Sequence, residues 1–305
     1  MWEEDERWQR LLGQLLPELA AAVRQAADLA AVQEIRLRTG WPVRLRLLDR
    51  ELTLDLIWRR EQQEQQLMLF LDNSVYAFEE QLRQGFVTLA GGHRVGLVGQ
   101  AWYADGRLGG FRDICSQNIR IARELPGVAK PLLPYIICRG RVLRTLLAAP
   151  PGVGKTTLLR DLVRMLADGE AGISPLNVGV ADERMELAAV FNGQAQLNVG
   201  SRCDVISGCE KASAVQILLR VMGPQVVVTD EIGSREDAAA LAEALNAGVS
   251  VLASAHAADY DELLGRPWLG DLLRQGFFER VIFPRRKGGV LLPAVVYDAD
   301  GVRLK

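Results

Sequence analysis

One loop in the middle of the chain has the residue types needed to hold a nucleoside triphosphate. Residues 146–159 read LLAAPPGVGKTTLL, an apolar run followed by a Pro/Gly loop and then a helical pattern. This is the strand–loop–helix context of the P-loop, or Walker A motif. Gly152 and Gly154 allow the backbone to turn several N–H groups toward phosphate oxygens, and the positive end of the helix dipole adds to them. The sequence therefore predicts a phosphate-binding loop.

The side chains of this loop predict ATP and Mg²⁺ as the cofactors. Lys155 can reach the β- and γ-phosphates, and the Thr156 hydroxyl can ligate Mg²⁺. The first glycine of the GxxxxGK[ST] pattern is replaced by Ala149, at a position that tightens the turn but faces no phosphate. We expect the nucleotide to be bound by Pro151, Gly152, Val153, Gly154, Lys155, Thr156, Thr157 and, from a later strand, His256.

A second predicted strand ends in two carboxylates. Residues 225–231, QVVVTDE, form an apolar β-branched run that finishes at Asp230 and Glu231. In P-loop NTPases a carboxylate at this point, the Walker B motif, holds Mg²⁺, and a neighbouring one can orient and deprotonate the attacking water. We assign Asp230 to the metal and Glu231 to the water. The alternative is a strand end with two solvated acids.

Two further strands bring polar side chains to the same region. The strand predicted at 176–181 is followed by Asp182 and Glu183, either of which could assist the metal or the water, or form only a local salt bridge. The strand predicted at 249–254 leads to His256, which could sense the γ-phosphate. Because ligands bind at the carboxyl ends of parallel strands in open α/β sheets, we expect these groups to meet.

These side chains need a sheet to position them, and the second part of the chain has the pattern of one. Predicted strands alternate there with helical segments, which indicates an α/β fold with a mostly parallel sheet and right-handed crossovers. The predicted strands lie at 142–148, 176–181, 225–229, 249–254 and 279–283.

The first part of the chain has a different pattern. Residues 6–30 have helical periodicity with a break at Pro17. Residues 35–47 alternate apolar residues with arginines, which predicts a β-hairpin whose arginine face is either solvated or in contact with a partner. We expect three parts: a smaller α+β domain at 1–125, a Pro/Gly-marked linker at 126–135 and the ATPase domain at 136–305.

Composition excludes several classes of protein. The chain has 36 basic and 38 acidic residues, so its overall charge gives no support to nucleic-acid binding, and no stable nucleic-acid partner is expected. Four cysteines without a CxxC pair, and only two histidines, argue against a zinc site. No apolar run reaches the roughly 18–20 residues of a membrane span, and the charged N-terminus is not a signal peptide. We expect a cytoplasmic protein.

Taken together, these motifs resemble the RecA-like hexameric ATPases of bacterial type II and type IV secretion. Those enzymes share a P-loop, an acidic box after the next strand, a segment like LLRVMGPQVVVTDEIG before the catalytic glutamate, and a His box after the following strand. The chain departs from them at Asp230, where many have glycine. Its acidic box aligns with either Glu183 or Glu186.

A more specific resemblance, to the stage III sporulation protein AA family, covers nearly the whole chain. It is carried by long stretches outside the generic ATPase motifs, among them EIRLRTGWPV, GGHRVGLVGQ, SQNIRIARE and TDEIGSREDAAALAEALNAGV. The family implies a RecA-like P-loop ATPase of endospore-forming bacteria in the mother-cell cytoplasm. It also implies a homo-hexamer that can dock, through partners, on a secretion-like complex in the membrane around the forespore.

By the same resemblance, arginines near the junction of the two domains reach a phosphate at the subunit boundary. Arg120 and Arg123 are the candidates, with Arg202 in reserve. An arginine supplied in this way stabilises the charge of the transition state and is worth about 10³–10⁵ in rate. The alternative is a pair of surface arginines on an alternating strand.

The predicted function is a Mg²⁺-dependent ATP hydrolase that acts as an oligomeric motor and energises a secretion-like membrane complex during endospore formation. One alternative is an ATP-binding switch or scaffold with little turnover, and another is a RecA-like nucleic-acid motor. The two carboxylates of the Walker B strand favour hydrolysis, and only the hairpin arginines favour nucleic acid. The catalytic candidates are Glu231, Lys155, Glu183, Arg120 and Arg123.

Overall fold

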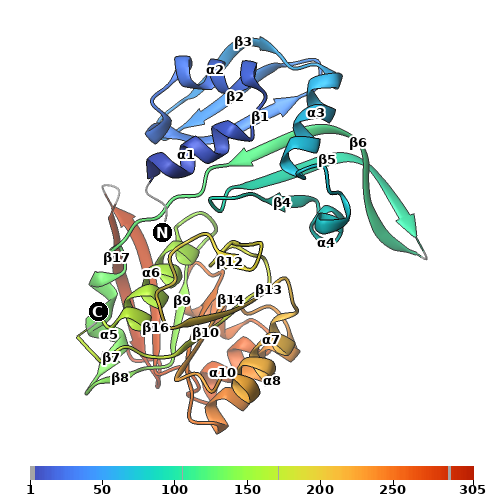
Figure 1. Cartoon of the computed structure of the whole chain (residues 1–305). Helices are drawn as coiled ribbons and strands as arrows, with labels where there is room; N and C mark the ends of the chain where they lie inside the picture. Colours follow the sequence, from blue (N-terminus) through green and yellow to red (C-terminus); the bar gives the residue numbers. More distant parts are fainter. Residues whose placement is uncertain (1–3, 105, 171, 288–289) are drawn as a thin grey trace. The chain divides into compact units, whose positions relative to one another are not determined.

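The computed structural model describes residues 4–104, 106–170, 172–287 and 290–305. Contacts within the chain divide it into two compact units (Figure 1). Unit 1 comprises residues 1–123 and 189–196, and unit 2 comprises residues 124–188 and 197–305.

Unit 1 is an α+β body built on a six-stranded antiparallel sheet with the strand order β3-β2-β1-β6-β5-β4. Its strands are β1 (Val32–Arg38), β2 (Pro42–Leu47), β3 (Glu51–Ile57), β4 (Phe86–Thr88), β5 (Arg94–Ala104) and β6 (Arg107–Arg120). Its helices are α1 (Glu4–Gly13), α2 (Pro17–Ala26), α3 (Arg60–Phe70) and α4 (Glu79–Arg83). The predicted helix break is confirmed, because Pro17 begins α2, where its missing N–H costs nothing.

The predicted hairpin is formed by β1 and β2. Its apolar residues Ile35, Leu37, Val43 and Leu45 are fully buried in the core of unit 1, and the arginines between them point to the other face. This alternation is what an antiparallel sheet with one covered face requires.

Unit 2 is an α/β body built on a seven-stranded sheet with the order β13-β10-β14-β15-β9-β16-β17. Every neighbouring pair is parallel except β16 and β17, which confirms the predicted mostly parallel sheet. Its strands are β9 (Thr145–Ala148), β10 (Val178–Asp182), β13 (Cys203–Ser207), β14 (Val226–Glu231), β15 (Ser250–Ala255), β16 (Arg280–Lys287) and β17 (Val290–Asp298). Its longer helices are α6 (Lys155–Asp168), α7 (Lys211–Val221) and α8 (Arg235–Asn246), with the shorter α9 (Tyr260–Leu264) and α10 (Leu269–Arg274).

The central strands of this sheet are buried along nearly their whole length. The run from Val226 to Val228 on β14 is at most 1% exposed, and Val251 and Ala253 on β15 are fully buried. Helices α7 and α8 contribute to the same apolar core. Such continuous apolar strands are typical of parallel sheets covered on both faces, which leaves only the strand ends for polar chemistry.

The predicted linker at 126–135 is not a free segment, because it packs within unit 2. Ala129 is fully buried, and the segment continues into a short helix, α5 (Leu133–Ile136). The carboxylate of Asp161 on α6 accepts hydrogen bonds from the amides of Gly127 (3.0 Å) and Ala129 (2.8 Å). Proline and glycine here make a packed turn rather than a hinge with no contacts.

A second departure from the predicted domain boundaries is the short hairpin of β11 (Val190–Phe191) and β12 (Gln194–Ala195). It was expected inside the ATPase domain, but residues 189–196 belong to unit 1. The side-chain oxygen of Gln196 accepts a hydrogen bond from the amide of Gly91 at 2.9 Å. This pairing joins segments 105 residues apart, so local sequence patterns carry no sign of it.

His93 lies in the core of unit 1 and is fully buried. Its Nδ1 accepts a hydrogen bond from the amide of Ala122 at 3.2 Å. Burial disfavours the charged imidazolium and lowers the pKa of His93 from 6.5 to about 4. The histidine is therefore a neutral part of the core, remote from any chemistry.

The stability of unit 1 should fall as the pH is lowered from 6.5 to 4. The unfolded chain takes up a proton at His93 in this range and the folded chain does not, so protonation favours unfolding by up to about 3 kcal/mol. Urea unfolding of the wild type and His93→Gln across this range measures the effect. The variant should lose less stability than the wild type on acidification, and parallel pH profiles would contradict this account.

Candidate functional site

The predicted phosphate loop joins the end of β9 to the start of α6. Gly152 has a φ of 79° and Gly154 a φ of 114°, both in the left-handed region that favours glycine. Gly154 is the N-cap of α6, so the unpaired N–H groups of the first helical turn face the loop. A Cβ on Gly154 would lie 3.0 Å from the Leu291 side chain, a tight contact that adds to the conformational need for glycine.

A cavity of about 340 Å³ opens over this loop and falls within the size range of small-ligand sites. Unit 2 alone forms it. It brings together most of the residues predicted from separate stretches of sequence: Gly152, Gly154, Lys155, Thr156, Thr157, Asp230, Glu231 and His256. Three charged residues that were given no catalytic role also line it: Arg184, Glu186 and Arg286.

Lys155 is buried at the floor of the cavity, where its ammonium is held by three acceptors. Its Nζ lies 2.7 Å from the carbonyl oxygen of Ala149, 3.2 Å from that of Pro150 and 2.7 Å from Nδ1 of His256. Burial lowers the pKa of Lys155, and the negative charge of Glu231 opposes that shift. The lysine is thus folded back on its own loop.

These contacts also indicate the tautomer of His256. A charged ammonium can only donate, so Nδ1 of His256 must accept and the ring proton must be on Nε2. That Nε2 lies 3.5 Å from Oε2 of Glu231. Lys155, His256 and Glu231 therefore form a continuous polar chain across the cavity.

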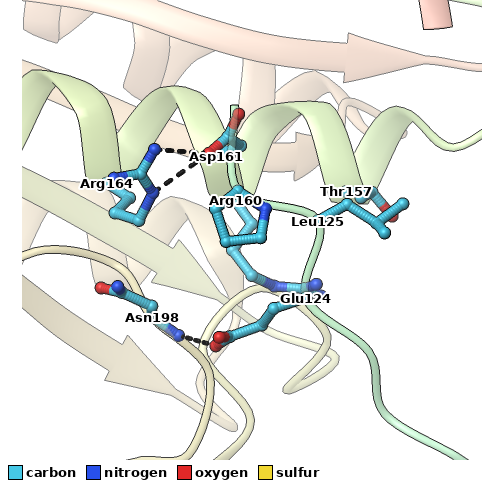
Figure 2. A pocket seen from close by; sticks show the side chains of 8 residues that line it. Glu124, Leu125, Thr157, Arg160, Asp161, Arg164 and Asn198 are labelled. Atoms are coloured by element: carbon cyan, nitrogen blue, oxygen red, sulfur yellow. Dashed lines mark hydrogen bonds and ion pairs between the residues drawn. The ribbon is translucent and has the colours of Figure 1, made fainter. Parts of the chain in front are cut away.

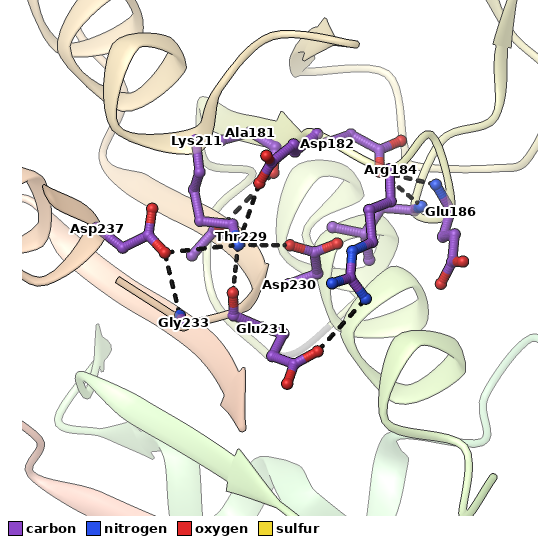
Figure 3. A network of polar contacts seen from close by, with 12 residues as sticks. Ala181, Asp182, Arg184, Glu186, Lys211, Thr229, Asp230, Glu231, Gly233 and Asp237 are labelled. Atoms are coloured by element: carbon purple, nitrogen blue, oxygen red, sulfur yellow. Dashed lines mark hydrogen bonds and ion pairs between the residues drawn. The ribbon is translucent and has the colours of Figure 1, made fainter. Parts of the chain in front are cut away.

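The two carboxylates at the end of β14 have different surroundings (Figure 3). Glu231 is partly exposed, and its Oε2 accepts a hydrogen bond from Arg184 at 3.4 Å. Asp230 is only 6% exposed, and its Oδ1 lies 3.0 Å from Nζ of Lys211. That approach is an ion pair without the angle of a hydrogen bond, because Oδ1 accepts no hydrogen bond within the part of the chain that the structure describes.

The acidic residues at and after the end of β10 differ in their roles: some are structural, and others line the cavity. The carboxylate of Asp182 is fully buried and accepts hydrogen bonds from the amides of Glu186, Leu187 and Ala188 at 2.8–3.0 Å. Burial raises the pKa of Asp182, whereas these three N–H groups lower it. Its oxygens are occupied by the main chain, so Asp182 shapes the loop rather than assisting a metal.

Glu183 does not line the cavity over the phosphate loop, in contrast to our expectation for a catalytic residue. Its side chain is 43% exposed and lies 3.6 Å from Lys211. Glu186, the other possible position of the acidic box, does line the cavity. The sequence had left the two positions open, and the fold of the loop places Glu186 at the site.

Helix α6 holds the loop that carries Glu186. The guanidinium of Arg160 donates to the carbonyl oxygens of Glu186 (2.6 Å) and Leu187 (2.7 Å). Further along, Asp161 and Arg164 form a buried ion pair at 2.9 Å (Figure 2). The pocket beside them has a volume of only about 10 Å³, room for about one water molecule. The contacts in this region anchor loops, and the enclosed space is too small for a nucleotide.

The predicted arginines lie outside this cavity. Arg120 and Arg123 belong to unit 1, whereas the cavity belongs to unit 2. Arg120 is exposed and lines a groove of about 500 Å³ with Arg36, Arg38 and Arg94. Arg123 instead donates to main-chain carbonyls of unit 1, including that of Val32 at 2.9 Å.

Two general properties of the described residues also bear on function. None of their helices is long and apolar enough to cross a membrane. They also contain no cluster of three or more His, Cys, Asp or Glu side chains arranged to hold a metal.

Comparison with known proteins identifies the family. The family described as "Sporulation stage III, protein AA" matches residues 3–304. The chain belongs to this family. Stage III sporulation protein AA of Bacillus subtilis (strain 168) is 42% identical over 270 residues, which cover 88% of each chain. The resemblance seen in the sequence is thereby confirmed.

Solved structures confirm the RecA-like fold. The ATPase DotB of Legionella pneumophila superimposes with a TM-score of 0.61 at 16% identity, over 94% of this chain and 82% of that one. The pilus retraction motor PilT, solved with bound ADP, gives a TM-score of 0.57 at 16% identity, over 90% and 80% of the two chains. At these identities the likeness shows the fold alone.

Replacing Lys155 with alanine should weaken ATP binding by about 100-fold, the equivalent of two charge-assisted hydrogen bonds to phosphate. Lys130→Ala, at an exposed position, is the matched control and should bind normally. Titration with a fluorescent ATP analogue measures both affinities. Wild-type affinity in Lys155→Ala would show that this loop does not bind the nucleotide.

Proposed function

We propose that this protein is a Mg²⁺-dependent ATP hydrolase that works as an oligomeric motor for a secretion-like membrane complex during endospore formation. The observation that carries the proposal is the meeting of the phosphate loop, the Asp230–Glu231 pair and His256 around one cavity. Family membership supports the role in sporulation. The ADP bound to the structural neighbour PilT supports a nucleotide as the ligand.

In this proposal the loop binds the triphosphate through its backbone. The N–H groups between Gly152 and Thr156 surround the phosphates, and the α6 dipole favours their negative charge. The Lys155 ammonium exchanges its carbonyl and His256 partners for phosphate oxygens. Once released from Lys155, His256 is free to contact the terminal phosphate.

The residues present fit a magnesium ion. The Thr156 hydroxyl and the Asp230 carboxylate line the same cavity, and Oδ1 of Asp230, which faces Lys211 at 3.0 Å, accepts no hydrogen bond from the described residues. Oxygen ligands of this kind, few in number, are what Mg²⁺ uses beside a phosphate chain. When bound, the ion neutralises charge on the β- and γ-phosphates.

Glu231 is the residue that we propose to orient the attacking water and accept its proton. Its carboxylate projects into the cavity and is directed by Nε2 of His256 and by Arg184. Glu186 lies on the cavity as well and takes the assisting role that the sequence had suggested for Glu183.

In the proposed function, a neighbouring subunit completes the nucleotide site. We propose a homo-hexamer in which unit 1 of one subunit presents an arginine to the nucleotide of the next. Arg120 suits this role better than Arg123, because it is exposed among other arginines while Arg123 is bound to main-chain carbonyls. We place the assembly in the mother-cell cytoplasm, docked through partner proteins on the membrane around the forespore.

Glu231→Gln should lower the turnover number about 100-fold or more, because a positioned general base typically contributes that much, and should leave ATP affinity intact. Glu243→Gln, exposed on α8, is the control and should turn over normally. Phosphate release and ATP binding are measured on the same assembled samples. Unchanged turnover in Glu231→Gln, with a loss in Glu186→Gln, would transfer the role to Glu186.

A further inference from the structure

Lys211, the first residue of α7, is a buried cation that none of the proposed roles uses. Its side chain is 5% exposed. Its Nζ lies 3.0 Å from Oδ1 of Asp230 and donates a hydrogen bond to the main-chain oxygen of Glu231 (Figure 3). An isolated ammonium would be costly at such a position, so these oxygen partners are what allow a lysine here.

Asp230 depends on this lysine more than the other nearby acids do. Glu183, 3.6 Å from Nζ, is 43% exposed and can be solvated. Asp237, 4.0 Å from Nζ, accepts hydrogen bonds from the amides of Gly233 and Ser234. Asp230 is buried, and its Oδ1 has no hydrogen bond among the described residues. The ammonium of Lys211, 3.0 Å from Oδ1, is therefore the counter-charge that faces the buried carboxylate of Asp230.

The contact with Glu231 adds to the strand pairing at the end of β14. The β14–β15 ladder shifts register between Val228 and Glu231, and pairing resumes between Glu231 and Ser254. Lys211 binds the main chain of Glu231 from one side while the Glu231 side chain projects into the phosphate cavity. One ammonium thus orients the proposed metal ligand and the proposed water-activating residue together.

We propose that Lys211 is a positioning residue of the hydrolytic site, which holds the Asp230 carboxylate and the Glu231 backbone in working geometry without contacting the nucleotide. The inference rests on the proposed hydrolase function. It assigns Lys211 an effect on turnover rather than on nucleotide affinity, because the lysine does not line the phosphate cavity.

A double-mutant cycle tests this role. Lys211→Met removes the charge and keeps most of the side-chain volume, and Asp230→Asn removes the charge that it compensates. Lys211→Met should lower kcat about 10- to 100-fold, as expected for misplaced catalytic groups, with ATP affinity in EDTA unchanged. In the Asp230→Asn background, the same replacement should have a much smaller effect on kcat. Lys130→Met is the exposed control and should behave as wild type.

Thermal unfolding of the metal-free, nucleotide-free proteins gives a readout independent of activity. Lys211→Met should lower the melting temperature by about 10 °C, because it leaves a buried carboxylate unpaired, and Asp230→Asn should restore most of that loss. If Lys211→Met does not fold alone, the double variant should still fold. If neither Lys211→Met nor the double variant folds while Asp230→Asn does, the pairing of Lys211 with Asp230 would be overturned.

The outcomes separate this inference from the proposed function. Full kcat in Lys211→Met, in a preparation where the wild type hydrolyses ATP, would overturn the role of Lys211 and leave the hydrolase intact. A drop in the melting temperature of Lys211→Met that Asp230→Asn does not reverse would also overturn the role of Lys211. A wild type without turnover would contradict the hydrolase, and the melting cycle would still decide whether Lys211 compensates Asp230.

Discussion

Three buried charges lie at or after the carboxyl ends of β9, β10 and β14, and each is compensated by partners within unit 2. Asp182 is satisfied by three amides of its own loop, Asp230 by Lys211, and Lys155 by two carbonyls and His256. These partners hold Lys155 and Asp230 at one cavity before any ligand arrives.

The same contacts explain why binding of a triphosphate should change the site. Lys155 and His256 are engaged with each other, and His256 also faces Glu231. In the proposed function, a phosphate that takes the Lys155 ammonium releases the histidine, which also faces the proposed water-activating carboxylate of Glu231. Helix α6 anchors both the 124–129 segment and the acidic loop. These contacts connect the phosphate loop to the rest of unit 2.

Much of this site could be predicted because its parts are local in sequence. The P-loop glycines, Lys155 and the acids at the end of β14 follow from short patterns that a strand–loop–helix unit imposes. Lys211, the choice of Glu186 over Glu183, and the hairpin at 189–196 depend on contacts between distant segments, which leave no periodic signal. The packing of the 126–135 segment could not be predicted, because proline and glycine mark turns in packed and free segments alike.

The central claim is that this cavity hydrolyses ATP and does not merely bind it. Its most direct test is phosphate release by the wild-type protein, measured over a range of protein concentrations with Mg²⁺ and with EDTA. The account predicts saturable release that requires Mg²⁺ and whose rate per chain rises with protein concentration as neighbouring subunits complete the site. Tight ATP binding with no phosphate release at any concentration would contradict it and indicate a nucleotide-binding switch.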